Sequence, residues 1–277
     1  SGYPFMPLLR FVPAVCCGLL ALLITTGCST ATGTGPLEEV KTPWQAGAMV
    51  TAANPHAVDA AMDVLRAGGH AVDAAIAAHA VLGLVEPQSS GLGGGAFMMV
   101  YQRDQDSLVF HDGREVAPAA ATPDMFMRDG EAMGFMAAWQ GGVSIGVPGV
   151  VALYEDTHRQ YGKLPLATLL QPAIDLARDG FEVSPRMAAF LPRIAELGRL
   201  DENPGAAAYF YPQGKPLQVG HVLKNPEYAA TLSRIAAEGS PAFYQGAVAE
   251  AMVAQARAEP NPIPCGSGRT ASCRWPT

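Results

Sequence analysis

The chain has 277 residues, of which 49% are hydrophobic and only 16% are charged, so it can bury a sizeable core. Its net charge of -7 comes without a cluster of lysine and arginine, which argues against nucleic acid as a partner. Ordinary solubility is the simplest interpretation of this acidic balance.

The N-terminal segment has the order of an export signal. An apolar run over 11–24 follows a basic residue and leads through small residues to Cys28, and it is shorter than the ~20 residues of a membrane span. Residues 1–28 resemble a bacterial lipoprotein signal with Cys28 as the lipidated residue, and 29–45 have the composition of a tether. We therefore expect an exported, periplasmic protein held to the membrane by a lipid anchor, with plain secretion as the alternative.

The five cysteines avoid the middle of the chain. Three lie at or before residue 28 and two lie at 265 and 273, with none between 29 and 264. This distribution excludes a disulfide framework, a thiol nucleophile and a thiolate metal site from the central region. The six histidines lack metal-binding spacing, so the sequence implies no metal and no organic cofactor.

The central region opens with a predicted strand over 47–53 and two helices. Asn54 is placed to cap the first helix, with Pro55 in its first turn and Gly68 at its end. Its predicted buried face consists of Val58, Ala61, Met62 and Leu65.

The second helix follows His70, is rich in alanine and is predicted to end near Pro87. His79 lies within it and is expected to be a hydrogen-bonded core residue. The stretch "SSGLGGGAF" comes next and contains Gly91, Gly93 and Ala96 in a dinucleotide-binding spacing. A helix precedes these glycines and a strand follows them, whereas a phosphate site needs the opposite order. We therefore interpret the glycines as a tight turn that allows close packing.

Two strands are predicted next, over Ala96–Gln102 and Leu108–Val116, paired as a hairpin. From Pro123 onward the pattern is mostly helical, with one helix within 147–162, another within 166–185, and two more within 225–260. Strands beside helix pairs indicate an α+β or layered αβ architecture with a helical lobe.

Several long stretches resemble the gamma-glutamyltransferase family of N-terminal nucleophile hydrolases. They include "AANPHAVDAAMDVLRAGGHAVDAAIAAHAVLGLVEPQSSGLGGGAFMMVY", "DGREVAP", "SIGVPGVVALYE" and "LKNPEYAATLSRIAAEGSPAFYQG", in the family's order over about 46–258. The resemblance implies a four-layer αββα sandwich, made as a precursor that cuts itself into a large and a small subunit. It also implies that the glycine-rich stretch is a helix-to-strand connection with no phosphate to hold.

The resemblance identifies one substrate-binding residue. Arg114 in "DGREVAP" matches the family arginine that binds the α-carboxylate of the gamma-glutamyl group, a task suited to a planar guanidinium. Asp112 and Glu115 are expected to orient this arginine. The alternative is an arginine paired only with these two acids.

The family's nucleophile is a threonine that opens the small subunit, and the resemblance places it beyond residue 277. The local lookalike at Thr157 lies inside a predicted helix, and we reject it. Residues 46–262 therefore correspond to the large-subunit region, and 263–277 read as a frame-shifted or disordered tail of a truncated precursor.

The function implied is transfer or hydrolysis of the gamma-glutamyl group of glutathione and related amides through a threonine acyl-enzyme, with no activity expected of this chain alone. The partners implied are these substrates and the small subunit. A cephalosporin or glutaryl acylase of the same superfamily is one alternative. A non-enzymatic, membrane-tethered binding lipoprotein is another.

Overall fold

The computed structural model describes residues 47–258 of the chain. The chain divides near Gly47, and the fold described below belongs to the unit that begins at Ala48. The predicted signal, the lipidation site Cys28, the tether and the tail at 263–277 lie outside the described residues. No helix in the described part of the chain is both long and apolar enough to span a membrane.

Two helices open the fold, α2 (Pro55–Arg66) and α3 (Ala71–Val85). The Asn54 side chain caps α2, Pro55 is in the first turn, and Gly68 adopts a positive φ of 89° just past the end, as the sequence predicts. The His70 side chain caps α3 in a capping box with Asp73. Local sequence rules are therefore sufficient to place both helices.

The predicted buried face of α2 is wrong by one position. Its fully buried residues are Ala57, Ala60, Ala61 and Val64, whereas Val58, Met62 and Leu65 are only partly buried. Small side chains face α3, which lets the two helices pack closely, while the larger apolar residues lie on the flanks.

The predicted strand over 47–53 is also wrong, because nothing in the described part of the chain pairs with it. From Met49 to Ala53 its residues alternate between exposed and partly buried, and Val50 and Ala52 pack against the core. The two-residue period is therefore present, but a strand also needs a hydrogen-bonded neighbour.

The predicted hairpin is confirmed as β1 (Ala96–Gln102) paired antiparallel with β2 (Ser107–Gly113). The turn between them contains a short 3-10 helix, Arg103–Gln105. The second strand ends three residues earlier than predicted, and Val116 instead forms an isolated bridge with Val147. The remaining strands are short antiparallel pairs, β3 (Met127–Arg128) with β4 (Glu131–Ala132) and β5 (Phe181–Glu182) with β6 (Val222–Leu223).

Helices dominate the rest of the described chain. They are α4 (Phe135–Trp139), α5 (Val150–Tyr161), α6 (Leu166–Asp179), α7 (Pro185–Gly198), α8 (Pro204–Phe210), α9 (Pro226–Glu238), α10 (Pro241–Tyr244) and α11 (Gly246–Ala258). The two helices predicted within 225–260 are confirmed as α9 and α11, with the short α10 between them.

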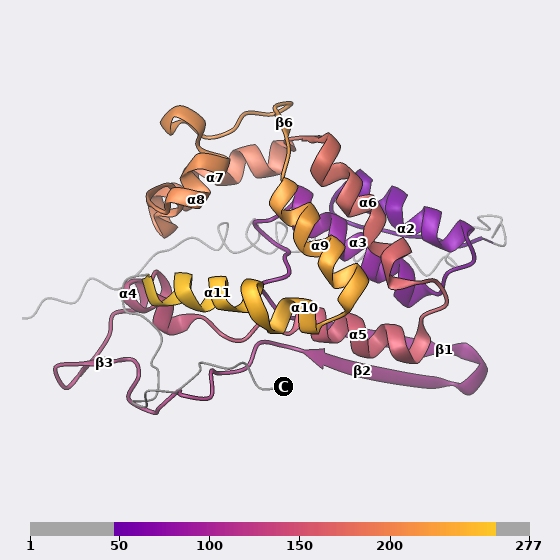
Figure 1. The fold of residues 1–277 in the computed structure, drawn as a ribbon, viewed down its shortest axis with the longest axis horizontal. Coiled ribbons are helices and arrows are strands. Elements are labelled where there is room, and N and C mark those ends of the chain that lie inside the picture. The colour runs from indigo at the N-terminus through magenta and orange to yellow at the C-terminus, as the bar shows by residue number, and fades with distance from the viewer. Residues whose placement is uncertain (1–46, 259–277) are drawn as a thin grey trace, which may run out of the picture. The chain divides into compact units, whose positions relative to one another are not determined.

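The core forms where α3, α6 and α9 pack together, and α3 contributes buried residues from most of its circumference (Figure 1). Burial lowers the pKa of His79 in α3, and its Nδ1 lies 2.6 Å from the Tyr154 hydroxyl, which confirms the expected hydrogen-bonded core histidine. The described fold combines a helical core with antiparallel strand pairs and is α+β, as predicted.

Candidate functional site

The glycine-rich turn connects α3 to β1, as the order of predicted elements requires. Its Gly94 carbonyl accepts hydrogen bonds from the backbone amides of Gly149 and Val150, at 3.0 and 3.2 Å. These two amides belong to the start of α5, where the first helical N–H groups lack intrahelical partners. The turn therefore contributes a carbonyl that accepts from this helix N-terminus. A phosphate-binding turn instead contributes backbone N–H groups that donate to the phosphate.

The glycines of this turn differ in what surrounds them. A Cβ at Gly91 or Gly93, the two motif glycines, would meet nothing within 4 Å. A Cβ at Gly95 would lie 2.5 Å from Oε2 of Glu115 and 2.8 Å from its backbone nitrogen. The close packing predicted for the turn is therefore present at Gly95, against the residue that follows Arg114.

The three predicted site residues lie together at the end of β2. The Oδ1 atom of Asp112 accepts a 2.8 Å hydrogen bond from the backbone amide of Arg114. The Nε atom of Arg114 lies 3.5 Å from Oε2 of Glu115, and the arginine side chain is 68% exposed. Asp112 therefore contacts the backbone of Arg114 and Glu115 contacts its guanidinium. Most of the guanidinium faces solvent.

A groove of about 700 Å³ lies beside Arg114. It is lined by the end of β2, by Val147–Gly149 with the start of α5, and by residues of α10 and its flanks, Ser240, Pro241, Tyr244 and Gln245. Figure 1 shows the arrowhead of β2, the start of α5 and α10 close together at this point. The arginine therefore opens onto a space large enough for a small organic substrate.

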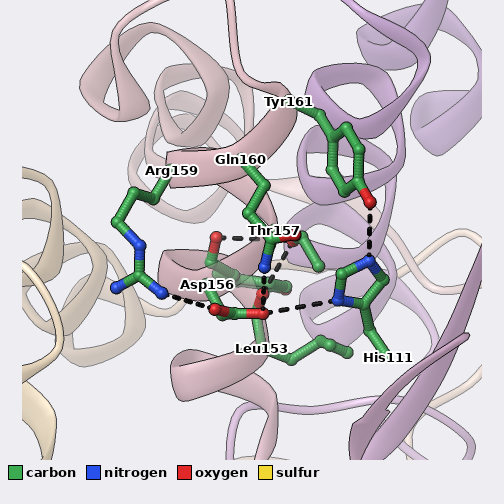
Figure 2. A network of polar contacts seen from close by, with 8 residues as sticks. His111, Leu153, Asp156, Thr157, Arg159, Gln160 and Tyr161 are labelled. Carbon is green, nitrogen blue, oxygen red and sulfur yellow. Dashed lines mark hydrogen bonds and ion pairs between the residues drawn. The ribbon is translucent and has the colours of Figure 1, made fainter. Parts of the chain in front are cut away.

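A partly buried polar network centred on His111 ties β2 to α5, and sequence reasoning missed it (Figure 2). His111 is 8% exposed, with its Nδ1 3.3 Å from Oδ2 of Asp156 and its Nε2 3.1 Å from the Tyr161 hydroxyl. Because a carboxylate only accepts, the His111 Nδ1–H donates to Asp156, and Nε2 shares a hydrogen bond with the Tyr161 hydroxyl. Arg159 and Gln160 also donate to Asp156. The network fixes the strand one residue before Asp112.

Thr157, the rejected nucleophile, lies inside α5 as predicted. It is fully buried, and its hydroxyl donates to the Leu153 carbonyl at 2.7 Å, a contact visible in Figure 2. A hydroxyl held in this way inside a helix has no access to a substrate.

Glu86 is a buried acid that lies where α3 ends and the turn begins. It is 2% exposed and accepts hydrogen bonds from Asn54 at 3.0 Å, Gln88 at 2.5 Å and Arg186 at 3.3 Å. Its backbone carbonyl accepts from the amides of Ser89 and Ser90. Glu86 thus anchors the start of the glycine-rich turn to α2 and α7.

Within residues 47–258, no group of three or more histidine, cysteine, aspartate or glutamate side chains could hold a metal ion. The polar side chains that line the groove are those of His111, Asp112, Arg114, Asp156, Ser240, Tyr244 and Gln245. This donor set is suited to a charged organic substrate.

A family model described as gamma-glutamyltranspeptidase matches residues 57–267, which include the glycine-rich turn, Arg114 and the groove. This chain belongs to the gamma-glutamyltranspeptidase family. Glutathione hydrolase 3 of Arabidopsis thaliana is 40% identical over 190 residues, covering 69% of this chain and 29% of that protein. The glutathione hydrolase proenzyme of Bacillus subtilis (strain 168) is 37% identical over 205 residues, covering 74% of this chain and 34% of that protein. The chain therefore spans about a third of the length of these relatives.

Solved structures of the family have the same fold. The crystal structure of Helicobacter pylori gamma-glutamyltranspeptidase matches with a TM-score of 0.73 at 32% identity, covering 78% of this chain and 61% of that chain. The crystal structure of cephalosporin acylase from Bacillus halodurans matches with a TM-score of 0.61 at 30% identity, covering 73% of this chain and 38% of that chain. The family match confirms the resemblance noted in the sequence and the N-terminal nucleophile hydrolase fold class.

Proposed function

We propose that residues 46–262 are the large-subunit region of an enzyme that transfers or hydrolyses the gamma-glutamyl group of glutathione and related amides. The observation that carries the proposal is Arg114, an exposed guanidinium at the end of β2 that lines a groove of about 700 Å³. Within the described part of the chain, the ion pair of Arg114 is a 3.5 Å contact from Nε to Glu115, so its terminal nitrogens can bind a carboxylate bidentately.

The proposed chemistry needs a threonine nucleophile, which we propose to lie in the small subunit. Its hydroxyl oxygen attacks the γ-carbonyl carbon, the amine leaves with a proton, and the acyl-enzyme passes its acyl group to water or to an acceptor amine. Arg114 contributes by holding the α-carboxylate, which sets the position of the γ-carbonyl. No activity is proposed for residues 1–277 alone.

The proposed partner for this chemistry is a small subunit derived from the same precursor. The outer face of the β1–β2 hairpin offers it an apolar surface of half-exposed side chains, Phe97, Met99, Tyr101, Leu108 and Phe110. Phe97 and Phe110 contact each other there across the two strands, with ring centroids 5.3 Å apart. A contiguous exposed apolar face of this kind is typical of a protein interface.

An acylase is the second candidate, favoured by the match to the Bacillus halodurans cephalosporin acylase. A glutaryl group carries its free carboxylate at the same distance from the amide carbonyl as a gamma-glutamyl group, and it lacks only the α-ammonium. Arg114 fits both acyl groups, so discrimination depends on an anion that pairs with the ammonium. Comparing kcat/KM for a gamma-glutamyl anilide and a glutaryl anilide separates the candidates, since the proposed function requires the gamma-glutamyl substrate to be preferred.

We expect Arg114→Lys, in the precursor that includes the small subunit, to lower kcat/KM for a gamma-glutamyl anilide by about 10- to 100-fold. Lysine keeps the charge but loses the bidentate fork, and a hydrogen bond to a charged group contributes about 1.5–3 kcal/mol. Chromophore release measures the effect. Arg103→Lys is the control, because Arg103 lies in the exposed turn of the β1–β2 hairpin. Equal kcat/KM in the parent and the Arg114→Lys variant contradicts the substrate-binding role.

We also propose export with lipidation at Cys28, on the strength of the apolar run and small residues before it. In a bacterium with lipoprotein processing, the chain should incorporate labelled fatty acid and sediment with membranes, since a lipid chain adds about 0.8 kcal/mol of membrane affinity per buried methylene. Cys28→Ala should lose the label and Cys265→Ala should keep it. Labelling that persists in Cys28→Ala contradicts the anchor.

A further inference from the structure

The N-terminus of α5 is capped by segments distant in sequence. Its N-cap residue, Gly149, has no side chain with which to bind the first helical amides. The amides of Gly149 and Val150 donate to the Gly94 carbonyl, and the amide of Ala152 donates to the Tyr244 hydroxyl at 3.1 Å. Tyr244, at the end of α10, therefore satisfies an amide that the local sequence leaves without a partner.

The same hydroxyl donates to the Pro148 carbonyl at 2.8 Å. Burial raises the pKa of Tyr244, so the phenol stays protonated and can donate at neutral pH. The ring of Tyr244 lies edge-on to Phe243, with centroids 5.1 Å apart, and Phe243 is buried in the core. The Tyr244 hydroxyl therefore binds residues on both sides of Gly149, Pro148 before it and Ala152 after it.

This turn lies directly against the backbone that carries Arg114. Val147, next to Pro148, exchanges two hydrogen bonds with Val116, at 2.8 and 3.3 Å. A Cβ on Gly149 would lie 2.2 Å from the Gly113 carbonyl oxygen and 2.7 Å from that of Arg114. The segment from Val147 to Gly149 therefore packs against the backbone on both sides of Arg114, at Gly113 and at Val116.

We propose that Tyr244 is a positioning residue for Arg114, acting through its hydrogen bonds to Pro148 and Ala152. It holds the segment 147–149 in place, and that segment holds the end of β2. An effect of Tyr244 on catalysis rests on the proposed function, in which Arg114 binds the substrate carboxylate. An effect of Tyr244 on the position of Arg114 is independent of that function. Tyr244 also lines the groove, so its side chain helps to define the space in which a substrate would lie.

The test compares Tyr244→Phe with Tyr228→Phe in this chain by amide hydrogen exchange and by the NMR signal of the Arg114 Nε–H group, which is assigned by its loss in Arg114→Lys. Tyr228 is a matched control because its hydroxyl donates to the Ala80 carbonyl at 2.8 Å and it does not line the groove. Tyr244→Phe should speed exchange of the Ala152 and Val147 amides by about 2- to 10-fold, as expected for a lost hydrogen bond. It should also shift or broaden the Arg114 signal.

Tyr228→Phe should leave the Arg114 signal and these two amides unchanged. Faster exchange in Tyr244→Phe with an unchanged Arg114 signal overturns the proposal, because the hydroxyl then stabilises α5 without positioning the arginine. Equal changes in both variants also overturn it, because the effect is then a general loss of stability.

A double-mutant cycle in the precursor that includes the small subunit connects this positioning to turnover. Tyr244→Phe should lower kcat/KM in the parent but have little further effect in the Arg114→Lys background, since both changes act on one interaction. Additive effects overturn the proposal. If Arg114→Lys alone leaves turnover unchanged, the proposed function fails, while the Arg114 signal in this chain still decides whether Tyr244 positions the arginine.

Discussion

Glu86→Ala should lower the free energy of unfolding of this chain by about 2–4 kcal/mol, because each buried donor left without an acceptor costs about 1–3 kcal/mol. The change removes the acceptor of Asn54 and Gln88, whose side-chain nitrogens bind a carboxylate that is 2% exposed. Arg186 also loses its bond to Glu86, but it keeps its hydrogen bond to the Ser89 hydroxyl, and its side chain is 55% exposed, so water can replace the carboxylate.

Urea denaturation measures this effect, with Glu196→Ala as the matched control. Glu196 lies on the exposed face of α7, where removing a surface carboxylate should change stability by less than about 0.5 kcal/mol. Glu86→Gln should fall between the two, because an amide oxygen still accepts from one of the donors. Equal stability of the Glu86→Ala and Glu196→Ala variants would show that the buried carboxylate does not anchor the turn.

Gly149→Ala should destabilise the fold by about 3 kcal/mol or more, at the upper end of the range for overpacking. The backbone of Gly149, with φ -106° and ψ -16°, is one that alanine can adopt, so the penalty comes from contact alone. The new Cβ would lie 2.2 Å from the Gly113 oxygen and 2.6 Å from the Gly113 carbonyl carbon. Both atoms belong to the backbone, which cannot rotate away as a side chain can.

Gly93→Ala is the matched control for this substitution, since a Cβ there meets nothing within 4 Å. It should be neutral or stabilise the chain by up to about 1 kcal/mol through the reduced freedom of the unfolded state. Thermal unfolding of the two variants gives the comparison. If Gly149→Ala is tolerated as well as Gly93→Ala, the start of α5 does not press against the Arg114 backbone as described.

The elements predicted correctly are those that local rules define. Asn54, Pro55 and Gly68 delimit α2, and the short apolar and aromatic runs of β1 and β2 define the hairpin. The buried face of α2 could not be predicted in this way, because ranking residues by size favours Met62 over the alanines that contact α3. The segment 47–53 has the alternation of a strand, but pairing is a tertiary property that a single segment does not encode.

In the candidate site too, some residues can be predicted from the sequence and others are identified only in the folded structure. Arg114 was predicted from its family motif, and Asp112 and Glu115 from their position beside it. Tyr244 and Asp156 come from helices far along the chain, and their contacts with the β2 region and with α5 arise only in the folded structure. Glu86 had a faint local signal, an isolated acid at the end of a strongly apolar helix, where burial requires polar partners.

The central claim is that Arg114 binds substrate and takes no part in maturation. The measurement that tests it most directly follows Arg114→Ala in the precursor that includes the small subunit, scoring subunit cleavage by electrophoresis and gamma-glutamyl anilide turnover in the same preparation. We expect normal cleavage together with a loss of kcat/KM larger than that of Arg114→Lys, because cleavage uses the precursor's own peptide and not the substrate carboxylate. Normal cleavage with turnover at the parent rate would contradict it and would make Arg114 a structural residue.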